Sequence, residues 1–246
     1  MRNNYIIIIL SGLVLASISP LPAQNENYPV EYYKLDDSLY MYRSTILYEG
    51  NKISSNGLII EGKDSVVVVD TPWNIEQTRQ VLTWVDSVLA KPIAIFVITH
   101  AHDDRIGGIA EVHKYGISTV SGTLTQQQAD KKGFEQPCQT FEQELTIKLS
   151  GIDLILYYPG AGHTVDNTVV YLPDRDLLYG GCFIKSAGAK NIGNLKDANV
   201  IAWPVSLDNL QARFPKAKTV IPGHGSYQPG AIENTRRLIH DYLSQH

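Results

Sequence analysis

Side chains that can bind a metal gather in one short stretch of the sequence, residues 98–108. His100, His102 and Asp104 alternate there and follow an almost wholly apolar run, 91–97, which predicts a strand buried on both faces. Side chains two residues apart on an extended segment share a face, so the two imidazoles point to the same side. Two nitrogen donors and a carboxylate suit a divalent borderline metal, above all zinc. We expect a zinc site rather than an ordinary buried histidine, because burying so many polar groups unpaired is costly.

Three further segments repeat this arrangement of a predicted strand, glycines and a potential ligand. They are 158–167 with His163, 180–185 with Cys182, and 220–225 with His224. Glycine lets the backbone bend and approach closely, which a crowded metal site requires. Four such segments in one chain indicate a metal centre. The other three histidines are expected to be solvated, on helices or at the terminus: His113, His240 and His246.

The elements expected around these segments alternate between strands and helices. Short antiparallel strands are expected over 31–48, and a buried strand over 66–70 is followed by a helical pattern over 74–89 and the strand before His100. We expect a hairpin loop at 48–55, turns at Asn56-Gly57 and around 62–64, a helix beginning near Arg105, and one capped by Thr123. Later strands are expected near 145–149, 153–158, 168–172, 177–180 and 219–221, with helices over 206–214 and 231–243. This order favours an α/β fold with two mixed sheets packed between outer helices.

Length and composition fit one domain. The chain has 246 residues, is 43% hydrophobic and has a formal net charge of -4. This is enough chain to bury a substantial core, and no linker or low-complexity segment divides it. No basic run indicates a nucleic-acid or membrane surface, so we expect no nucleic-acid partner and a monomer as the default state.

The N-terminus has the pattern of a secretory signal peptide. Arg2 precedes an apolar run, 5–18, that is too short to span a bilayer comfortably. A small residue, Ala23, ends the segment that follows, which predicts a signal peptide over 1–23 and a single mature domain over 24–246. The protein is then periplasmic, with no membrane association after cleavage; an uncleaved membrane anchor is the alternative.

The chain contains two cysteines, Cys138 and Cys182. An even number permits a disulfide in an oxidising compartment. Cys138 lies in a polar, glutamine-rich segment, whereas Cys182 follows a predicted strand and two glycines. These different surroundings favour two separate thiols, with Cys182 held as a thiolate by metal.

These motifs together resemble the metallo-β-lactamases, and specifically the zinc enzymes of subclass B1. The resemblance extends from about Tyr32 to the C-terminal helix. Its carriers are Asp-Thr-Pro-Trp at 70–73, Thr-His-Ala-His-Asp-Asp-Arg at 99–105, Gly-His-Thr-Val-Asp-Asn at 162–167, Gly-Gly-Cys-Phe-Ile-Lys at 180–185 and Pro-Gly-His-Gly at 222–225. The first histidine motif is shared by a superfamily of hydrolases, but its combination with Arg105, Cys182 and Lys185 is specific for the subclass. The fold that it implies is a four-layer αβ/βα sandwich.

The resemblance implies two zinc ions per chain. The first ion is held by His100, His102 and His163, and the second by Asp104, Cys182 and His224. Three protein ligands per ion is the number found in catalytic zinc sites, since structural zinc is closed by four. Two ions about 3.5–4 Å apart can share a hydroxide and stabilise both the attacking and the leaving groups.

The implied reaction is zinc-dependent hydrolysis of the β-lactam amide of penicillins, cephalosporins and carbapenems, sparing monobactams. A zinc-bound hydroxide attacks the ring carbonyl, whose oxygen also meets the Asn194 amide. Lys185 pairs with the substrate carboxylate as a point charge. Without the resemblance, Lys185 is an ordinary solvated lysine and Asn194 a residue that shapes its Gly-Asn turn.

Supporting roles are also implied. Asp70 orients the metal ligands without binding the metal itself, or else it caps the helix expected over 74–89. Arg105 orients Asp104, or pairs with a surface carboxylate. The 48–55 loop resembles the mobile flap of the family, without a tryptophan at its tip.

Two other functions are alternatives to β-lactam hydrolysis. A glyoxalase II-like thioesterase of the same superfamily carries a histidine after the aspartate of the first motif and bridges its metals with an aspartate, whereas this chain has Arg105 and Cys182. A non-catalytic periplasmic zinc-binding protein is less consistent with six donors shared between two ions.

Overall fold

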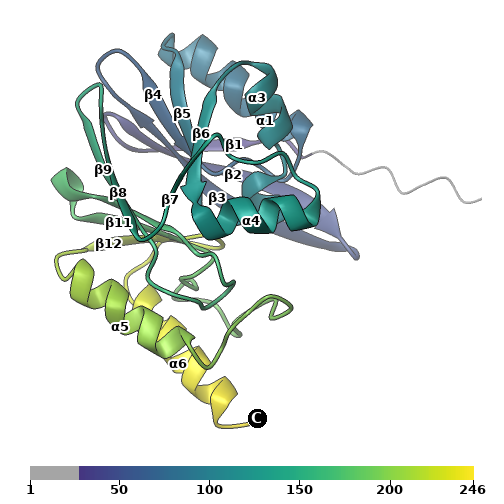
Figure 1. The fold of residues 1–246 in the computed structure, drawn as a ribbon, viewed down its shortest axis with the longest axis vertical. Coiled ribbons are helices and arrows are strands. Elements are labelled where there is room, and N and C mark those ends of the chain that lie inside the picture. The colour runs from purple at the N-terminus through teal and green to yellow at the C-terminus, as the bar shows by residue number, and fades with distance from the viewer. Residues whose placement is uncertain (1–27) are drawn as a thin grey trace, which may run out of the picture.

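The computed structural model describes residues 28–246, which form two facing β-sheets with helices on the outside (Figure 1). In this part of the chain, one sheet has seven strands in the order β1-β2-β3-β4-β5-β6-β7, and the other has five in the order β12-β11-β10-β9-β8. Helices α1 and α3 cover the first sheet and α5 and α6 cover the second (Figure 1). The expected α/β fold with two mixed sheets between outer helices is therefore confirmed.

The first sheet changes from antiparallel to parallel at β4. Neighbours from β1 to β4 pair antiparallel, and neighbours from β4 to β7 pair parallel. Its strands are β1 (Glu31–Asp36), β2 (Leu39–Tyr48), β3 (Asn51–Glu61), β4 (Val66–Val69), β5 (Ile93–Ile98), β6 (Ser118–Gly122) and β7 (Gln139–Phe141).

The second sheet is antiparallel except for its last pair. Its strands are β8 (Glu144–Leu149), β9 (Ile152–Tyr157), β10 (Val169–Leu172), β11 (Leu177–Gly181) and β12 (Thr219–Pro222). Strands β11 and β12 run parallel, so their carboxyl ends meet at the same edge of the sheet. The residues that follow these two ends, beginning with Cys182 and Gly223, therefore lie close together.

The helices are short and follow the strands closely. They are α1 (Ile75–Trp84), continued by the π-helical turn η1 (Val85–Leu89), α2 (Asp103–Ile106), α3 (Ile109–Lys114), α4 (Thr123–Lys132), the 3-10 turn η2 (Pro173–Arg175), α5 (Trp203–Arg213) and α6 (Ala231–Leu243). Asn74 caps α1, since its side chain accepts a hydrogen bond from the Gln77 amide at 2.9 Å. Asp70 is therefore not the cap of this helix.

The core lies in three layers that follow from the alternation of side chains along each strand. In β4, Val67 and Val69 join the cluster between the two sheets, and Val66 and Val68 join the cluster beneath the helices. All four valines are completely buried, as expected for a strand covered on both faces. This rigid centre places the carboxyl ends of β4 and β5 next to each other.

The hairpin expected at 48–55 is present but its turn is shorter than predicted, and the turn expected at Asn56-Gly57 is wrong. Strands β2 and β3 form a long hairpin whose turn is only Glu49-Gly50, and β3 continues through Gly57. Gly57 lies opposite Tyr42, and a Cβ on Gly57 would overlap the Tyr42 ring. The glycine therefore makes room for a cross-strand ring instead of forming a turn.

The helix expected near Arg105 is also different. Helix α2 begins at Asp103 and ends at Ile106, and α3 begins only after Gly107-Gly108. A Cβ on Gly108 would overlap the Thr78 side chain of α1, so the chain bends to let the two helices approach.

The cap expected at Thr123 is wrong as well. Its hydroxyl donates to the Phe141 carbonyl at 3.0 Å, and Gly122 occupies the capping position of α4.

Both cysteines lie within residues 28–246 and both are free thiols: Cys138 is exposed and Cys182 is buried. The expectation of two separate thiols is confirmed. The signal peptide predicted over 1–23 lies outside the described residues. From residue 28 onward, the chain has no helix that is both long and apolar enough to cross a membrane.

Candidate metal centre

The four ligand-bearing segments meet in a cleft of about 1040 Å³ at one edge of the two sheets. Residues 99–104 follow β5, Cys182 follows β11 and His224 follows β12, while His163 lies in the loop between β9 and β10. The cleft is bordered by both halves of the chain. Its apolar lining includes Ile46, Tyr48, Ile53, Trp73, Phe134 and Ile184.

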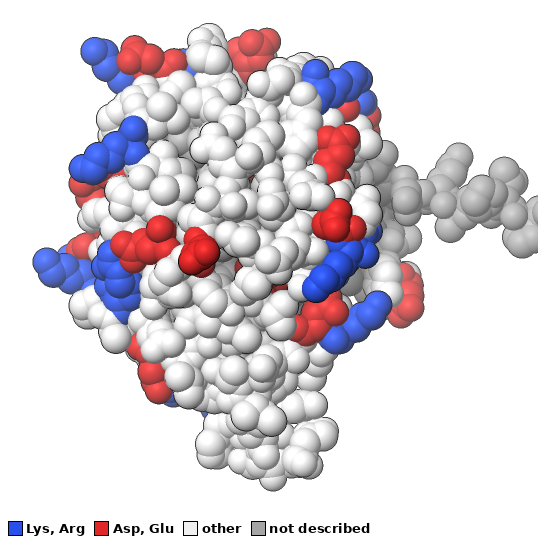
Figure 2. All heavy atoms as spheres, viewed as in Figure 1, with Lys and Arg blue, Asp and Glu red and all other residues white. Residues whose placement is uncertain are grey.

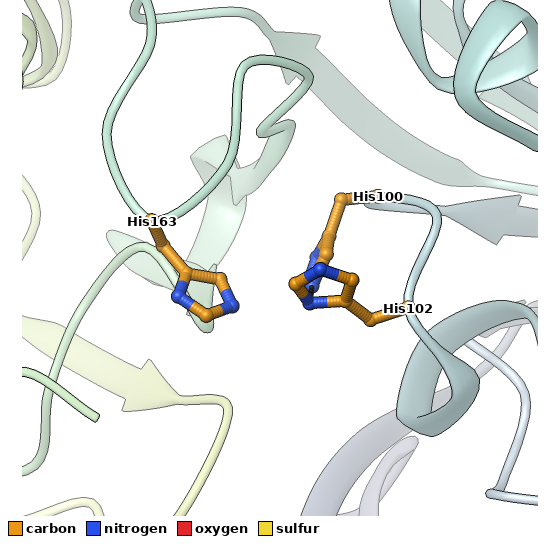
Figure 3. Close-up of side chains that lie close together, drawn as sticks. All are labelled: His100, His102 and His163. Carbon is orange, nitrogen blue, oxygen red and sulfur yellow. Dashed lines mark hydrogen bonds between the residues drawn. The ribbon is translucent and has the colours of Figure 1, made fainter. Parts of the chain in front are cut away.

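Three histidines form the first donor cluster. The rings of His100, His102 and His163 converge from two loops (Figure 3), and each offers a ring nitrogen within 4.8 Å of the others. His100 Nε2 lies 3.1 Å from His102 Nδ1. This spacing is suitable for two ligands of one tetrahedral zinc, whose Zn–N bonds are about 2.0–2.1 Å long.

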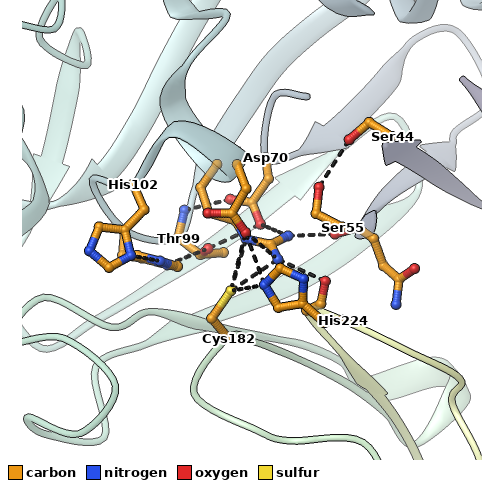
Figure 4. Close-up of polar contacts among 12 residues, drawn as sticks. Ser44, Ser55, Asp70, Thr99, His102, Cys182 and His224 are labelled. Carbon is orange, nitrogen blue, oxygen red and sulfur yellow. Dashed lines mark hydrogen bonds and ion pairs between the residues drawn. The ribbon is translucent and has the colours of Figure 1, made fainter. Parts of the chain in front are cut away.

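Asp104, Cys182 and His224 form the second donor cluster. The Cys182 Sγ lies 3.4 Å from Asp104 Oδ2 and 3.2 Å from His224 Nε2, and the last two atoms are 3.2 Å apart. Figure 4 shows Cys182 and His224 facing each other in a dense set of polar contacts. The structure thus brings the six expected donor residues together, and His100 lies close enough to Asp104 and Cys182 to form a group of three with them as well.

Hydrogen bonds to the outer ring nitrogens orient two of the histidines. His102 Nε2 lies 2.8 Å from Asp197 Oδ2, and His224 Nδ1 lies 2.7 Å from the Ser54 carbonyl oxygen. Because both oxygens are acceptors, these nitrogens carry protons, and the other ring nitrogen of each histidine is directed at its donor cluster. His163 Nδ1, by contrast, is buried without a hydrogen-bond partner among residues 28–246.

Burial keeps two histidines of the first cluster, His100 and His163, neutral. It lowers the pKa of His100 and of His163 well below the usual value, since the charged imidazolium is poorly solvated there, and neighbouring positive charges act in the same direction. A neutral imidazole is the form that binds a metal.

The second cluster concentrates negative charge. Burial opposes ionisation of Asp104, but Arg105 at 2.9 Å outweighs it and holds the pKa of that carboxyl well below its usual range. Burial also opposes charge on His224, yet Cys182 and Asp104 outweigh it and raise the pKa of the ring to about 10. Such a cluster attracts a positive charge strongly, so a dication bound by a thiolate, a carboxylate and an imidazole fits these residues.

Arg105 lies behind the second cluster and is completely buried. Its guanidinium donates to Cys182 Sγ at 3.0 and 3.3 Å, to the Gly223 carbonyl at 2.8 Å and to the Tyr179 hydroxyl at 2.7 Å. The alternative prediction, that Arg105 pairs with a surface carboxylate, is wrong. Arg105 instead holds the sulfur and the loop after β12 in fixed positions.

Asp70 lies one layer further back. Its carboxylate accepts from the Thr99 amide at 2.8 Å, the Thr99 hydroxyl at 3.0 Å and the Tyr179 hydroxyl at 2.8 Å (Figure 4). Burial raises the pKa of Asp70 to about 6, although Arg105 opposes the shift. The Asp70 backbone has a φ of 65°, a left-handed conformation at the end of β4. Asp70 thus fixes the backbone from which His100 projects.

Lys185 and Asn194 both border the cleft. Lys185 is only 9% exposed, and its ammonium lies 5.3 Å from the centre of the Trp203 ring. Burial lowers its pKa, with Cys182 and Asp104 opposing the shift. Asn194 is exposed, and its side-chain oxygen accepts from the Lys196 amide at 3.0 Å.

Four further polar residues of the centre carry no sequence signal. Tyr179 and Asn56 join Arg105 and Asp70, while Asp197 and Lys132 join His102. In the sequence, Tyr179 has the pattern of an ordinary strand residue and Asn56 that of a turn residue. Asp197 sits three residues after Asn194 in a polar loop, and Lys132 ends a helix whose last residues are basic. Only the tertiary fold brings these residues to the centre.

Comparison with known proteins agrees with this geometry. The family model of the metallo-β-lactamase superfamily matches residues 50–224. A metallo-β-lactamase type 2 of Bacteroides fragilis is 35% identical over 240 residues, covering 97% of this chain and 96% of that protein.

Two solved structures are also similar. A metallo-β-lactamase from Pontibacter korlensis has a TM-score of 0.84 and 38% identity, over 86% of this chain and 99% of that one. A metallo-β-lactamase of Pseudomonas aeruginosa, solved in a mono-zinc form, has a TM-score of 0.82 and 33% identity, over 89% and 99% of the two chains. The chain therefore belongs to the metallo-β-lactamase superfamily, as a metal-dependent hydrolase of the type 2, subclass B1 group.

Proposed function

We propose that this protein hydrolyses the amide bond of β-lactams, with up to two zinc ions held by its six clustered donors. The observation that carries the proposal is the pair of three-donor clusters at the floor of one cleft, where His100 lies close enough to contribute to both groups. Three protein ligands per ion leave coordination positions open, as catalytic zinc requires. When bound there, zinc acts as a Lewis acid that polarises a carbonyl and lowers the pKa of a bound water to about 7.

The residues around the donors supply binding and orientation. The Lys185 ammonium is the group that receives the substrate carboxylate, and the Trp203 ring beneath it limits its movement. The Asn194 amide, on the loop next to Lys185, donates to the carbonyl oxygen as negative charge develops on it. Asp104, Cys182 and His224 hold the position next to the departing amide nitrogen.

The β2–β3 hairpin provides an apolar wall. Ile46, Tyr48 and Ile53 line the cleft from this hairpin, and Tyr48 is 56% exposed. Apolar substituents of a substrate can pack against these side chains, and closing the wall excludes water from the donors. The hairpin thus takes the place of the tryptophan-tipped flap, with aliphatic side chains and a tyrosine.

We also propose finer properties, of which the substrate range is implied by the resemblance and the signal peptide and the monomeric state are the expectations from the sequence. The substrates include carbapenems together with penicillins and cephalosporins, and a thioesterase activity of the glyoxalase II type is the alternative. Residues 1–23 are a signal peptide and 24–246 a single periplasmic domain that acts as a monomer. Lys and Arg are interspersed with Asp and Glu on the face seen in Figure 2, which supports a small-molecule substrate rather than nucleic acid.

The test is absorbance-monitored hydrolysis of a carbapenem by the mature chain. We expect turnover that a chelator abolishes and added zinc restores. Absence of turnover with two equivalents of zinc bound would contradict the proposal. Hydrolysis of thioesters under the same conditions would then favour the alternative, and tight zinc binding with no turnover would favour a zinc-binding protein.

A further inference from the structure

Asp197 connects the first donor cluster to helix α4. Its Oδ2 atom lies 2.8 Å from His102 Nε2 and 2.7 Å from Lys132 Nζ. Lys132 is the last residue of α4. Asp197 belongs to the segment 190–199, here called the Asn194 loop. One carboxylate oxygen therefore joins a ligand ring, a helix and the loop that carries a substrate-contact residue.

Lys132 makes a second contact at the same place. Its ammonium donates to the Ala101 carbonyl at 3.0 Å, and Ala101 lies between the two histidines of the first motif. On its other side, the Ala101 amide donates to Asp166 Oδ2 at 2.9 Å. Both the amide and the carbonyl of buried Ala101 are thus hydrogen-bonded, which fixes the backbone between His100 and His102.

We propose that Lys132 is a positioning residue that, through Asp197, fixes the His102 ring and the Asn194 loop in one arrangement. The inference rests on the metal site proposed above. Asp197 accepts the Nε2 proton, so Nδ1 of His102 stays directed at His100 and at the metal position. Lys132 keeps Asp197 in place, because the carboxylate is one-third exposed and otherwise free to turn to solvent.

The direction in which zinc affinity changes when Lys132 is removed distinguishes the positioning role from a simple charge effect. An ammonium near a metal cation repels it, so removal of Lys132 by itself predicts tighter zinc binding. The positioning role predicts the opposite, because a ring that is no longer oriented is a poorer ligand. Loss of an outer partner of a metal ligand typically weakens metal binding 10- to 100-fold.

The experiment compares Lys132→Met with Lys131→Met in the mature chain. Both lysines lie on α4, and Lys131 is exposed, so the second variant removes the same charge without touching Asp197. Zinc dissociation constants are measured by competition with a chromogenic chelator. Cobalt substitution shows which cluster each dissociation constant belongs to. Only the second cluster has a thiolate, and its charge-transfer absorption reports whether that cluster is occupied. We expect about tenfold weaker binding at the three-histidine cluster in Lys132→Met alone.

Two further variants test the connection. Lys132→Met should weaken zinc binding less in an Asp197→Ala background than in the unmodified chain, because only the contact of Lys132 with the Ala101 carbonyl is then left to lose. Lys132→Arg, which keeps the charge and donors, should restore part of the affinity. Amide hydrogen exchange should become faster in residues 190–199 for Lys132→Met and not for Lys131→Met.

Equal or tighter zinc binding by Lys132→Met would overturn the inference, as would additive effects of the two substitutions. If the unmodified chain binds no zinc, the proposed function fails instead. If it binds zinc without hydrolysing a carbapenem, the positioning role is still tested, because every readout here is independent of turnover.

Discussion

At the scale of single residues, the proposed substrate-binding role of Lys185 rests on its burial in the cleft. This lysine is a nearly buried cation, three residues after Cys182, and it faces the space above the donors beside Trp203. Burying a charge is costly unless a partner compensates it. A substrate carboxylate is a partner of the right sign, and binding it returns part of the solvation that Lys185 lost on folding.

We expect Lys185→Ala to raise KM with little change in kcat. Ion pairing with the carboxylate is made in the ground state and kept in the transition state, so its loss weakens binding uniformly. A hydrogen bond to a charged group contributes about 1.5–3 kcal/mol, which corresponds to a roughly 10- to 100-fold rise in KM. Steady-state kinetics with a carbapenem measure it, with the exposed Lys190→Ala as control. Unchanged KM in Lys185→Ala would refute the role.

The same lysine predicts a pH dependence. Burial lowers the pKa of Lys185 below its usual value. The ammonium that binds a carboxylate is present below this lowered pKa and is lost as the pH rises through it. KM should therefore rise on the alkaline side, and less so in Lys185→Arg, whose guanidinium stays protonated. A KM–pH profile that is the same in both proteins would contradict this assignment.

At the scale of elements, the β2–β3 hairpin connects the cleft wall to the base of the donor clusters. Tyr42 crosses from β2 to β3 over Gly57, and its hydroxyl donates to the Asp70 carbonyl at 2.8 Å. Asn56, which precedes Gly57 in β3, donates from its side chain to the carbonyls of Pro222 and Gly225, on either side of His224. The hairpin therefore holds both the β4 end and the loop after β12.

We expect Gly57→Ala to destabilise the fold and disturb the centre together. The added Cβ overlaps the buried Tyr42 ring, and overpacking of this kind costs about 1–3 kcal/mol. Urea unfolding measures the loss. Gly188→Ala is the matched control, because nothing lies within 4 Å of a Cβ at Gly188. Equal stability of the two variants would show that Tyr42 moves aside without cost.

The sequence predicts the strands well and indicates which donor side chains lie close together, because each has a local signal. Val66–Val69 and Ile93–Ile98 are continuous apolar runs that the structure buries completely or largely as β4 and β5. The two segments with Cys182 and His224 come together because β11 and β12 are parallel and end at one edge. The ends of strands and helices are harder to predict. Gly57 and Gly108 make room for Tyr42 and Thr78, which are distant in the sequence.

The supports of the donors could not be predicted for the same physical reason. Tyr179, Asn56, Asp197 and Lys132 act through tertiary hydrogen bonds that join residues 31 to 169 positions apart. No periodicity or spacing encodes such contacts. Arg105 illustrates the difference: its position in the motif was evident, but its complete burial against Cys182 and Gly223 follows only from the fold.

At the scale of the whole molecule, each donor cluster crosses the boundary between the two sheets. His100, His102 and Asp104 follow a strand of the seven-stranded sheet, whereas Cys182 and His224 follow strands of the five-stranded sheet. His163 also comes from the second half of the chain. A metal bound to either cluster therefore connects two halves that are otherwise held together by the core between the sheets.

We accordingly expect zinc removal to lower the stability of the whole fold. A ligand that binds only the folded state at 100 times its Kd stabilises it by about 2.7 kcal/mol, which is roughly 5–10 °C in Tm for a chain of this size. Thermal unfolding of the zinc-loaded and chelator-treated protein measures the difference. Cys138→Ser, at an exposed thiol far from the motifs in sequence, should keep the full zinc-dependent shift, whereas Cys182→Ser should lose part of it. Equal Tm with and without zinc would mean that the halves are docked firmly by the core alone, and that the metal contributes to chemistry but not to cohesion.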